Sequence, residues 1–233
     1  MSPSKLKELQ LALGNIFIQL YGSTEHICAS LALSKPDHIL EGDDRHLASA
    51  GRPVPGVEVE LMDDDGQRVA TGEIGELWLR SRATGKGYFG DPEQTASEFK
   101  DGFWKSGDIG RMDERGFVYI VDRKKDMIIT GGFNVYANEV ESALNSHPAV
   151  LMSAVVGIPH EEWGEAIHAE VMLKTGAEAE PVELIEYVRE QLGGYKSPKT
   201  VEVVEELPVS AVGKVLRRQV REKYWSNEER KVG

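Results

Sequence analysis

The spacing of apolar and polar residues changes along the chain, and each change predicts a different kind of structure. Residues 2–14 begin with a serine and a proline, continue with lysines and leucines, and end at Gly14, which predicts a capped helix. Residues 16–20, IFIQL, predict a short buried strand. From 51 to 122 short alternating runs are divided by glycine and aspartate turns, and they predict a small β-rich module with one short helix beginning at Asp91-Pro92.

Charge marks the next change along the chain. Residues 122–126, DRKKD, are five consecutive charged residues between two apolar runs, so they predict an exposed connector. From 127 to 225 strand-like and helix-like runs alternate, which predicts a second domain of mixed α and β elements. The pattern as a whole therefore predicts an α+β protein of two domains, with the boundary inside DRKKD.

Three short polar motifs stand where a fold can hold a ligand. YGSTE at 21–25 follows directly on a predicted strand, the place where α/β folds put ligand-binding groups. Asp108 ends an SGD turn after a short strand, and one carboxylate can accept hydrogen bonds from both hydroxyls of a ribose. Lys214 presents an ammonium from a turn just before a helix. Taken singly, such motifs are more often plain turns or solvated charges.

The composition narrows the classes of function. The 233 residues carry a net charge of −12, so a phosphate backbone is repelled and nucleic acid is not an expected ligand. The single cysteine, Cys28, excludes an internal disulfide framework and a thiolate zinc site. No apolar window approaches the roughly 18 residues of a membrane span, and the first residues lack the apolar core of a signal peptide. We therefore expect the protein in the cytoplasm.

Seven motifs, in this order, resemble those of the superfamily of adenylate-forming enzymes. This superfamily includes acyl- and aryl-CoA synthetases, the adenylation domains of peptide synthetases and beetle luciferases. The motifs are YGSTE at 21–25, GRPVPG at 51–56, GEIGELWLRS at 72–81, GY at 87–88, WKSGD at 104–108, VDRKKDMIITGGFNVYANEVE at 121–141 and LPVSAVGKVLRR at 207–218. The resemblance implies an enzyme that converts a carboxylic acid and ATP to an acyl-AMP, releasing pyrophosphate, and then passes the acyl group to a thiol.

The resemblance implies roles for the five residues of YGSTE. The ring of Tyr21 stacks on adenine, and Gly22 lets the backbone approach it, with Ser23 also binding the nucleotide. The hydroxyl of Thr24 bonds the α-phosphate, and Glu25 holds Mg²⁺. The nucleotide, as ATP or AMP, and Mg²⁺ are thus the implied cofactors at this motif.

Five residues beyond YGSTE also receive roles from the resemblance. Asp108 and Arg123 contact the ribose, and the ammonium of Lys214 bridges the attacking carboxylate and the α-phosphate. Lys125 aligns with the hinge about which the small domain turns once the adenylate has formed. That turn brings in Gly132, which lines the tunnel for the pantetheine arm of coenzyme A.

The implied fold is the last part of a large N-terminal domain followed by a small mobile α+β domain. Residues 1–50 are the remnant of an α/β subdomain and 51–122 a β-barrel-like module, in which Gly85, Gly87 and Gly90 shape the loops. A hinge at 123–126 precedes the mobile C-terminal domain at 127–225, and 226–233 form a polar tail.

The chain departs from the family pattern in one large and several small ways. No Ser/Thr/Gly-rich phosphate loop precedes Tyr21, so the chain resembles the C-terminal portion of a synthetase, lacking the N-terminal portion of the same enzyme. We expect it not to adenylate appreciably alone, and robust ATP–pyrophosphate exchange by this chain would refute that expectation. Ala137 replaces a usual proline and should loosen the start of a helix. Ser210 and Val212 replace hydroxyl-bearing residues beside Lys214 and should weaken its loop.

Several alternatives stay open at this point. Free CoA is the expected acceptor because LGGY at 192–195 lacks the serine of a carrier domain, yet an adenylation domain with another acceptor is an alternative. His26, Ile27 and Cys28 could touch the acyl group, or belong to the core.

The chain could also be a non-catalytic AMP- or CoA-binding module, or half of a split enzyme. If a partner domain is missing, we expect an exposed apolar face around residues 6–20. Such a face favours association, including the formation of homo-oligomers.

Overall fold

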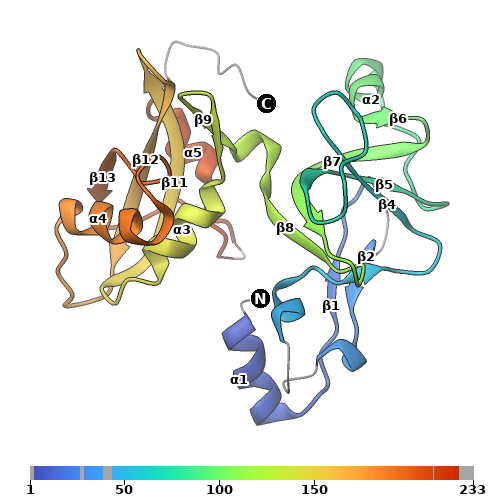
Figure 1. Ribbon diagram of the computed structural model, residues 1–233, viewed down its shortest axis with the longest axis horizontal. Helices are drawn as coiled ribbons and strands as arrows, with labels where there is room; N and C mark the ends of the chain where they lie inside the picture. Colours follow the sequence, from blue (N-terminus) through green and yellow to red (C-terminus); the bar gives the residue numbers. More distant parts are fainter. Residues whose placement is uncertain (1–2, 27–28, 39–43, 212, 226–233) are drawn as a thin grey trace. The chain divides into compact units, whose positions relative to one another are not determined.

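The structure of the protein, a computed structural model, describes residues 3–26, 29–38, 44–211 and 213–225 (Figure 1). It divides into two compact units, Met1–Val121 and Asp122–Gly233. The predicted mixed α+β fold class is confirmed. The division at Val121 falls one residue before DRKKD, while the finer partition into a hinge and a mobile domain stays a prediction.

The first unit opens with helix α1 (Pro3–Leu13) and a three-stranded antiparallel sheet. Its strands β1 (Gln19–Tyr21), β2 (Leu31–Leu33) and β3 (Arg52–Pro53) lie in the order β1-β2-β3. Two short 3₁₀ helices, η1 (Lys35–Asp37) and η2 (Arg45–Ala48), lie between β2 and β3. Leu6 of α1 packs with Leu33, Leu47 and Phe117 in a small buried cluster, which holds the helix against the rest of the unit.

The predicted buried strand at 16–20 is only partly right. The strand is Gln19–Tyr21, and the side chains of Ile16, Ile18 and Leu20 are 57, 57 and 61% exposed. Phe17 and Tyr21 face the other way and pack against buried clusters. Successive side chains of an extended chain point to opposite faces, and in the part of the chain that the structure describes only one face of this segment is covered.

The β-rich module of the first unit is a five-stranded antiparallel sheet. The strand order is β4 (Glu58–Met62), β5 (Ile74–Arg80), β7 (Phe103–Met112) and β6 (Phe99–Lys100), and β8 (Val118–Arg123) also pairs with β7. The short helix α2 (Pro92–Glu98) has Asp91 as its N-cap, whose side chain accepts a hydrogen bond from the backbone of Gln94 at 2.9 Å. The predicted strands and the predicted helix start are thus confirmed.

Two aspartates make the turns of this module by the same local bonds. The Oδ1 atom of Asp63 accepts from the backbone N–H groups of Asp65 and Gln67 at 3.0 and 2.8 Å. The Oδ1 atom of Asp113 accepts likewise from Arg115 and Phe117, at 3.0 and 2.9 Å. Such Asx bonds replace the ladder bonds that the strands lose where they reverse, so DDDG and DERG fix the ends of the strands.

The second unit is built on another five-stranded sheet. Its main path is β10 (Phe133–Val135), β9 (Ile128–Thr130), β12 (Gly164–Leu173) and β11 (Val150–His160), with β13 (Thr200–Val203) pairing parallel to β12. A 3₁₀ turn, η3 (Lys124–Asp126), precedes β9. The sequence pattern predicts a strand at 127–130 (MIIT) and a helix at 136–147, with no strand between them, so β10 was not predicted.

Three helices cover the two faces of this sheet. Val155 of β11 packs with α3 (Ala137–Asn145) and α4 (Pro181–Leu192), whereas its neighbours Ala154 and Val156 pack with α5 (Arg217–Glu222). The alternation along β11 therefore places α3 and α4 on one face and α5 on the other (Figure 1). The run KVLRRQVREKYW at 214–225 predicts a helix over its whole length, whereas α5 spans only Arg217–Glu222.

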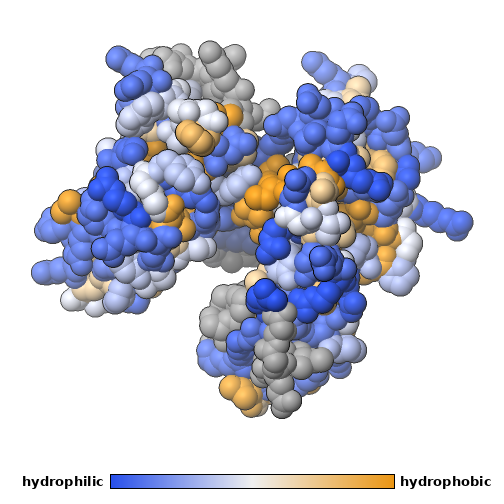
Figure 2. All heavy atoms as spheres, in the orientation of Figure 1, coloured by the Kyte–Doolittle hydropathy of each residue, from blue (hydrophilic) through white to orange (hydrophobic). Residues whose placement is uncertain are grey.

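Exposed apolar side chains occur within residues 6–20 of the first unit, where an apolar face is expected, except that Leu6 is buried. Around α1, Figure 2 shows a small apolar group among hydrophilic residues. Besides the three outward residues of the β1 segment, Leu11 and Leu13 of α1 are 81 and 56% exposed. No helix in the described ranges is long and apolar enough to cross a membrane. The exposed leucines and isoleucines of residues 11–20 therefore form a surface suited to protein association.

We expect the double substitution Ile18→Ser with Leu20→Ser to reduce self-association, because it removes two outward-facing apolar side chains of this surface. Sedimentation velocity over a range of protein concentrations measures the effect. Phe17→Ser is the matched control, since Phe17 faces the buried cluster around Leu33. It should lower the free energy of unfolding by about 2 kcal/mol without reducing association. A double variant that associates as strongly as the parent contradicts the prediction.

Candidate functional site

The candidate residues fall into two groups, one in each unit. Six residues of the first unit come from YGSTE and the SGD turn, and four of the second unit come from the connector, a glycine turn and the segment before α5. They are Tyr21, Gly22, Ser23, Thr24, Glu25 and Asp108, and Arg123, Lys125, Gly132 and Lys214.

Tyr21 and Asp108 are brought into direct contact. The Tyr21 hydroxyl donates to Oδ2 of Asp108 at 2.5 Å, although the residues lie 87 positions apart. Ser106, Gly107 and Asp108 were predicted as a turn after a short strand, but they lie inside β7, where its register with β5 shifts. There the backbone N–H of Asp108 donates to Oγ of Ser106 at 3.0 Å, and Gly107 has a φ of 69°. Strand β7 thus places the carboxylate of Asp108 beside the aromatic ring of Tyr21 in β1.

The glycine-rich loop at 84–88 lies against the end of YGSTE. The backbone N–H of Gly85 donates to the carbonyl oxygen of Glu25 at 2.7 Å, and His26 and Thr84 form an isolated β-bridge. A Cβ on Gly85 would lie 3.0 Å from that carbonyl oxygen, so a side chain here would press on the motif. A glycine at 85 therefore lets the two segments approach closely.

Tyr88 and Glu98 complete this part of the site, and sequence reasoning gave neither a role. The Tyr88 hydroxyl lies 3.2 Å from Oε1 of Glu25 and donates a short hydrogen bond to Glu98 at the end of α2. Burial raises the pKa of Tyr88, and its bond to Glu98 raises it further, so the phenol keeps its proton and donates. The only sequence signal for this residue was the GY motif itself.

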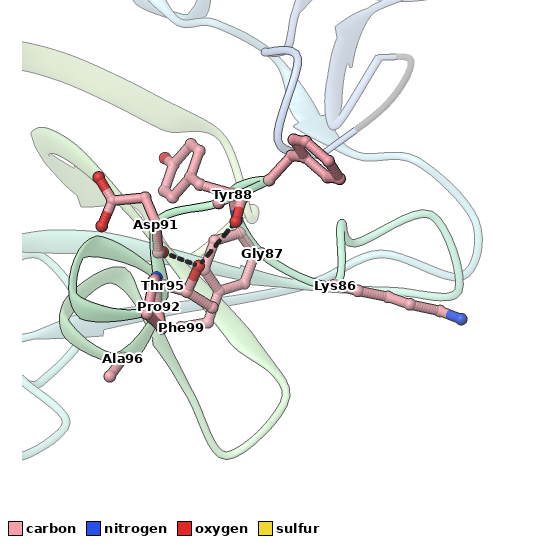
Figure 3. A pocket seen from close by; sticks show the side chains of 10 residues that line it. Lys86, Gly87, Tyr88, Asp91, Pro92, Thr95, Ala96 and Phe99 are labelled. Atoms are coloured by element: carbon pink, nitrogen blue, oxygen red, sulfur yellow. Dashed lines mark hydrogen bonds between the residues drawn. The ribbon is translucent and has the colours of Figure 1, made fainter.

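Helix α2 holds Tyr88 in place (Figure 3). Oγ1 of Thr95 accepts from the backbone N–H of Tyr88 at 2.8 Å and donates to the carbonyl oxygen of Asp91 at 2.7 Å. Gly87 has a φ of 135°, and a Cβ there would lie 2.3 Å from Cγ2 of Thr95. The segment 86–99 lines an open hollow with Tyr88 and Phe99 in its wall.

The remaining residues around YGSTE divide between surface and core. Thr24 is exposed, whereas Oγ of Ser23 accepts from the backbone N–H of His26 at 3.2 Å and closes the turn. His26 is 1% exposed and its Nδ1 pairs with Oγ of Ser30 at 2.8 Å, a position in the core that does not favour contact with an acyl group. Ile27 and Cys28 lie outside the described residues.

Lys214 is exposed near the tip of a hairpin in the second unit. Val209 and Val215 form a β-bridge, and the backbone N–H of Ser210 donates to the carbonyl oxygen of Lys214 at 2.8 Å. Oγ of Ser210 accepts from the backbone N–H of Lys214 at 3.1 Å, so the weaker loop expected from a serine at 210 is not seen there. Val212, the other departure, lies outside the described residues.

Gly132 lies in a tight two-residue turn between β9 and β10, with Phe133 paired to Thr130. Gly131 and Gly132 have φ values of 56 and 83°, and a Cβ on Gly132 would meet nothing within 4 Å. The turn therefore needs glycine for its backbone conformation rather than for lack of space. Arg123 and Lys125 are exposed, as predicted for the connector DRKKD, but Asp122 of the same run is completely buried.

The described residues also contain one group with the atoms to hold a metal ion. The ligand atoms of His168, Glu170 and Glu202 lie within 4.8 Å of one another. These atoms are already partnered: the ammonium of Lys223 lies 2.8 Å from both carboxylate oxygens of Glu170, and the Tyr224 hydroxyl pairs with Nε2 of His168 at 2.8 Å. The cluster therefore ties the end of α5 to the sheet.

Comparison with known proteins adds family matches to this geometry. The profile of the AMP-binding enzymes matches residues 1–89, and that of the AMP-binding enzyme C-terminal domain matches residues 139–214. The medium/long-chain-fatty-acid–CoA ligase FadD8 of Mycobacterium tuberculosis is 41% identical over all of this chain and 41% of its own length. A long-chain-fatty-acid–CoA ligase of Yersinia pestis is 46% identical over 94% of this chain and 37% of its own.

Solved structures resemble the same stretch. The amide bond synthetase McbA of Marinactinospora thermotolerans has a TM-score of 0.83 and 39% identity, over 95% of this chain and 45% of that one. ATP-bound MatB of Rhodopseudomonas palustris has a TM-score of 0.85 and 36% identity, over 95% of this chain and 43% of that one. The chain thus spans less than half the length of the proteins that it matches.

We expect Tyr88→Phe to lower the free energy of unfolding at pH 7 by about 1 kcal/mol, the usual value of one hydrogen bond. Burial alone raises the pKa of Glu98, but hydrogen bonds from Tyr88 and Gln94 outweigh it and hold the pKa below its usual value. A lowered carboxyl pKa stabilises the fold above the unfolded pKa of about 4.3. The difference between variant and parent should therefore shrink as the pH falls through the folded pKa.

Urea unfolding at several pH values checks this prediction. Tyr187→Phe is the control, because the Tyr187 hydroxyl donates to the Ser146 carbonyl oxygen, at 3.3 Å, and not to a carboxylate. A Tyr88→Phe variant whose stability difference stays constant down to acid pH would show that the hydroxyl does not act through Glu98.

Proposed function

The chain belongs to the family of AMP-binding enzymes, and from that premise we propose that it is part of an ATP-dependent, AMP-forming acyl-CoA ligase. The observation that carries the proposal is the meeting of three separate motifs in the first unit. YGSTE contacts the SGD turn through Tyr21 and Asp108, and the glycine loop through Glu25 and Gly85. Sequence-distant polar groups gathered in this way are typical of a ligand site.

The first unit supplies the nucleotide contacts in this proposal. A carboxylate has about four lone-pair sites, so the bond from Tyr21 is compatible with Asp108 also accepting from ribose hydroxyls. The exposed Thr24 hydroxyl is available to the α-phosphate, and Gly22 and Ser23 belong to the same turn. The ring of Tyr21 is proposed to flank the adenine.

The donor set around Glu25 fits Mg²⁺. Magnesium in phosphoryl-transfer sites is commonly held by one or two carboxylates together with phosphate oxygens, and when bound it neutralises developing phosphate charge. Glu25 offers a carboxylate, and the bond from Tyr88 at 3.2 Å orients it. Glu25 is accordingly the residue proposed to hold the ion.

Lys214 of the second unit is proposed to act on the first reaction. A carboxylate oxygen of the acid attacks the α-phosphorus of ATP, the α–β phosphoanhydride bond breaks, and pyrophosphate leaves with its electron pair. Two anions must approach each other in this step, and an exposed ammonium on a hairpin can lie against both. Arg123 is proposed as the second ribose contact.

The second reaction transfers the acyl group to coenzyme A. The thiolate sulfur attacks the acyl carbon, and AMP leaves as the carbon–oxygen bond breaks. In our proposal the second unit turns about the connector at Lys125 between the reactions, and Gly132 then lines the path of the pantetheine arm. The tight, side-chain-free turn at Gly132 is suited to a close approach. Fatty acids are the proposed acids, because the relatives named above are fatty-acid–CoA ligases.

A chimera tests the proposed function. This chain replaces the matching 37% of the Yersinia pestis ligase, so that the rest of that enzyme supplies what lies outside the match. We expect fatty-acid-dependent ATP–pyrophosphate exchange, and a loss of about 10²- to 10³-fold in Lys214→Ala, the usual effect of removing one group that stabilises developing charge.

Lys174→Ala is the matched control for this substitution. Lys174 is also a lysine of the second unit, and its ammonium donates to the Pro148 carbonyl oxygen at 2.6 Å, away from the Lys214 hairpin. An inactive but folded chimera that still binds AMP in calorimetry would favour the non-catalytic binding module instead. Equal activity of the Lys214→Ala and Lys174→Ala chimeras would remove Lys214 from the reaction.

A further inference from the structure

Arg217, the first residue of α5, is the centre of a largely buried network of charges. Its side chain is 13% exposed, and its guanidinium forks onto Glu141, with Nε 2.7 Å from Oε1 and Nη2 2.5 Å from Oε2. Nη2 also donates to Oδ1 of Asn138. Both acceptors belong to α3, so one side chain of α5 binds the helix on the opposite face of the sheet.

The same guanidinium binds both ends of the charged connector. Nη1 lies 3.1 Å from Oδ1 of Asp122 and 3.4 Å from Oδ2 of Asp126. The Asp122 side chain is completely buried, and it also accepts from the backbone N–H groups of Asn138 and Arg123, at 2.9 and 2.8 Å. Asp122 thereby caps α3 from outside the helix.

Arg221, one turn further along α5, adds a second cation to this network. It lies 2.7 Å from Oδ1 of Asp126. Burial raises the pKa of Asp126, but the guanidinium groups of Arg221 and Arg217 outweigh it and hold the pKa below its usual value. We call Asp122, Asp126, Asn138, Glu141, Arg217 and Arg221 the Arg217 network. The Arg217 network thus brings three carboxylates together with two guanidinium groups.

The hairpin that carries Lys214 ends at this network. The backbone N–H of Leu216 donates to the carbonyl oxygen of Pro208 at 2.8 Å, which closes the base of residues 208–216, the Lys214 hairpin. On one side the base is preceded by Leu207, which is buried with Val220. On the other side it runs directly into Arg217. Because the hairpin is closed by its own backbone bonds, these two neighbours set its direction.

We propose that Arg217 is a positioning residue that holds the Lys214 hairpin and the connector 122–126 in one rigid frame. The proposal rests on the proposed role of Lys214 and deepens it. Five hydrogen bonds from one planar side chain fix the start of α5 against α3 and against both connector carboxylates. Bidentate guanidinium geometry restricts orientation as well as distance. The base of the Lys214 hairpin therefore keeps a fixed place relative to the connector.

Hydrogen–deuterium exchange on this chain tests the geometry independently of activity. In Arg217→Lys and Arg217→Gln we expect the amides of Ser210, Gly213 and Leu216 to exchange about tenfold faster, because loosening of the network opens the hairpin locally. The amides of β12 should be unchanged. Arg217→Lys keeps a positive charge among the carboxylates but loses the bidentate guanidinium geometry. This variant therefore still tests the proposal if Arg217→Gln fails to fold.

Arg218→Gln is the matched control for exchange. Arg218 is the next residue, is 86% exposed, and pairs with Glu222 in its own helix at 2.7 Å. It should leave the hairpin amides unchanged. Unchanged hairpin exchange in both Arg217 variants overturns the proposal. So does uniform acceleration over the whole second unit, since that result shows a general loss of stability rather than a positioning role.

The chimera described above supplies the catalytic readout. Arg217→Lys should lower kcat for adenylation about tenfold and leave the KM for ATP within about twofold, because the proposed nucleotide contacts other than Arg123 belong to the first unit. Arg218→Gln should match the parent chimera. If Lys214→Ala abolishes exchange but Arg217→Lys does not lower kcat, the positioning role fails while the proposed function stands. If the parent chimera is inactive, the proposed function fails and the amide exchange alone decides the geometry.

Discussion

Burial of charge requires a partner for each charged group, and this constraint organises both units. A carboxylate or guanidinium removed from water costs several kcal/mol unless polar groups replace the water. The protein meets the requirement with long-range pairs: Asp108 with Tyr21 in the first unit, and Glu170 with Lys223 and Asp122 with Arg217 in the second. Each pair joins segments that are far apart in the sequence. In the first unit, the Asp108–Tyr21 contact also joins two motifs of the candidate site.

Glycine solves a second problem, the close approach of backbone to backbone. A Cβ on Gly51 would lie 2.1 Å from the carbonyl carbon of Ala32, and one on Gly75 would lie 2.8 Å from the carbonyl oxygen of Met62. Glycines such as Gly56 would meet nothing within 4 Å, and serve instead to give a positive φ, 85° at this position. The glycine-rich stretch 51–110 thus combines turn glycines with contact glycines. Gly85 belongs to the second kind, because it brings the glycine loop against Glu25.

Local features of the fold were predictable from the sequence, and features that depend on distant partners were not. The strands of the β-rich module and the start of α2 follow from alternation and from Asp91-Pro92, signals contained within a few residues. The outward direction of Ile18 was missed because burial depends on what covers a strand rather than on its own apolar residues. The site motifs were recognisable in order, but the bond from Tyr88 to Glu98 needed the packing of α2. Arg217 was passed over because charged residues are usually exposed, and its partner Asp122 lies 95 positions away.

The double attachment of the connector constrains how the protein can bend. Asp122 and Asp126 flank the three basic residues 123–125, and the guanidinium of Arg217 binds both carboxylates. A backbone rotation at Lys125 would carry Asp122 away from Arg217 and leave a completely buried carboxylate without that cation. A rotation ahead of Asp122, at Val121, leaves every bond of the network intact. The turn about Lys125 in the proposed reaction cycle therefore has to break the Asp122–Arg217 pair first, whereas a turn where the two units divide does not.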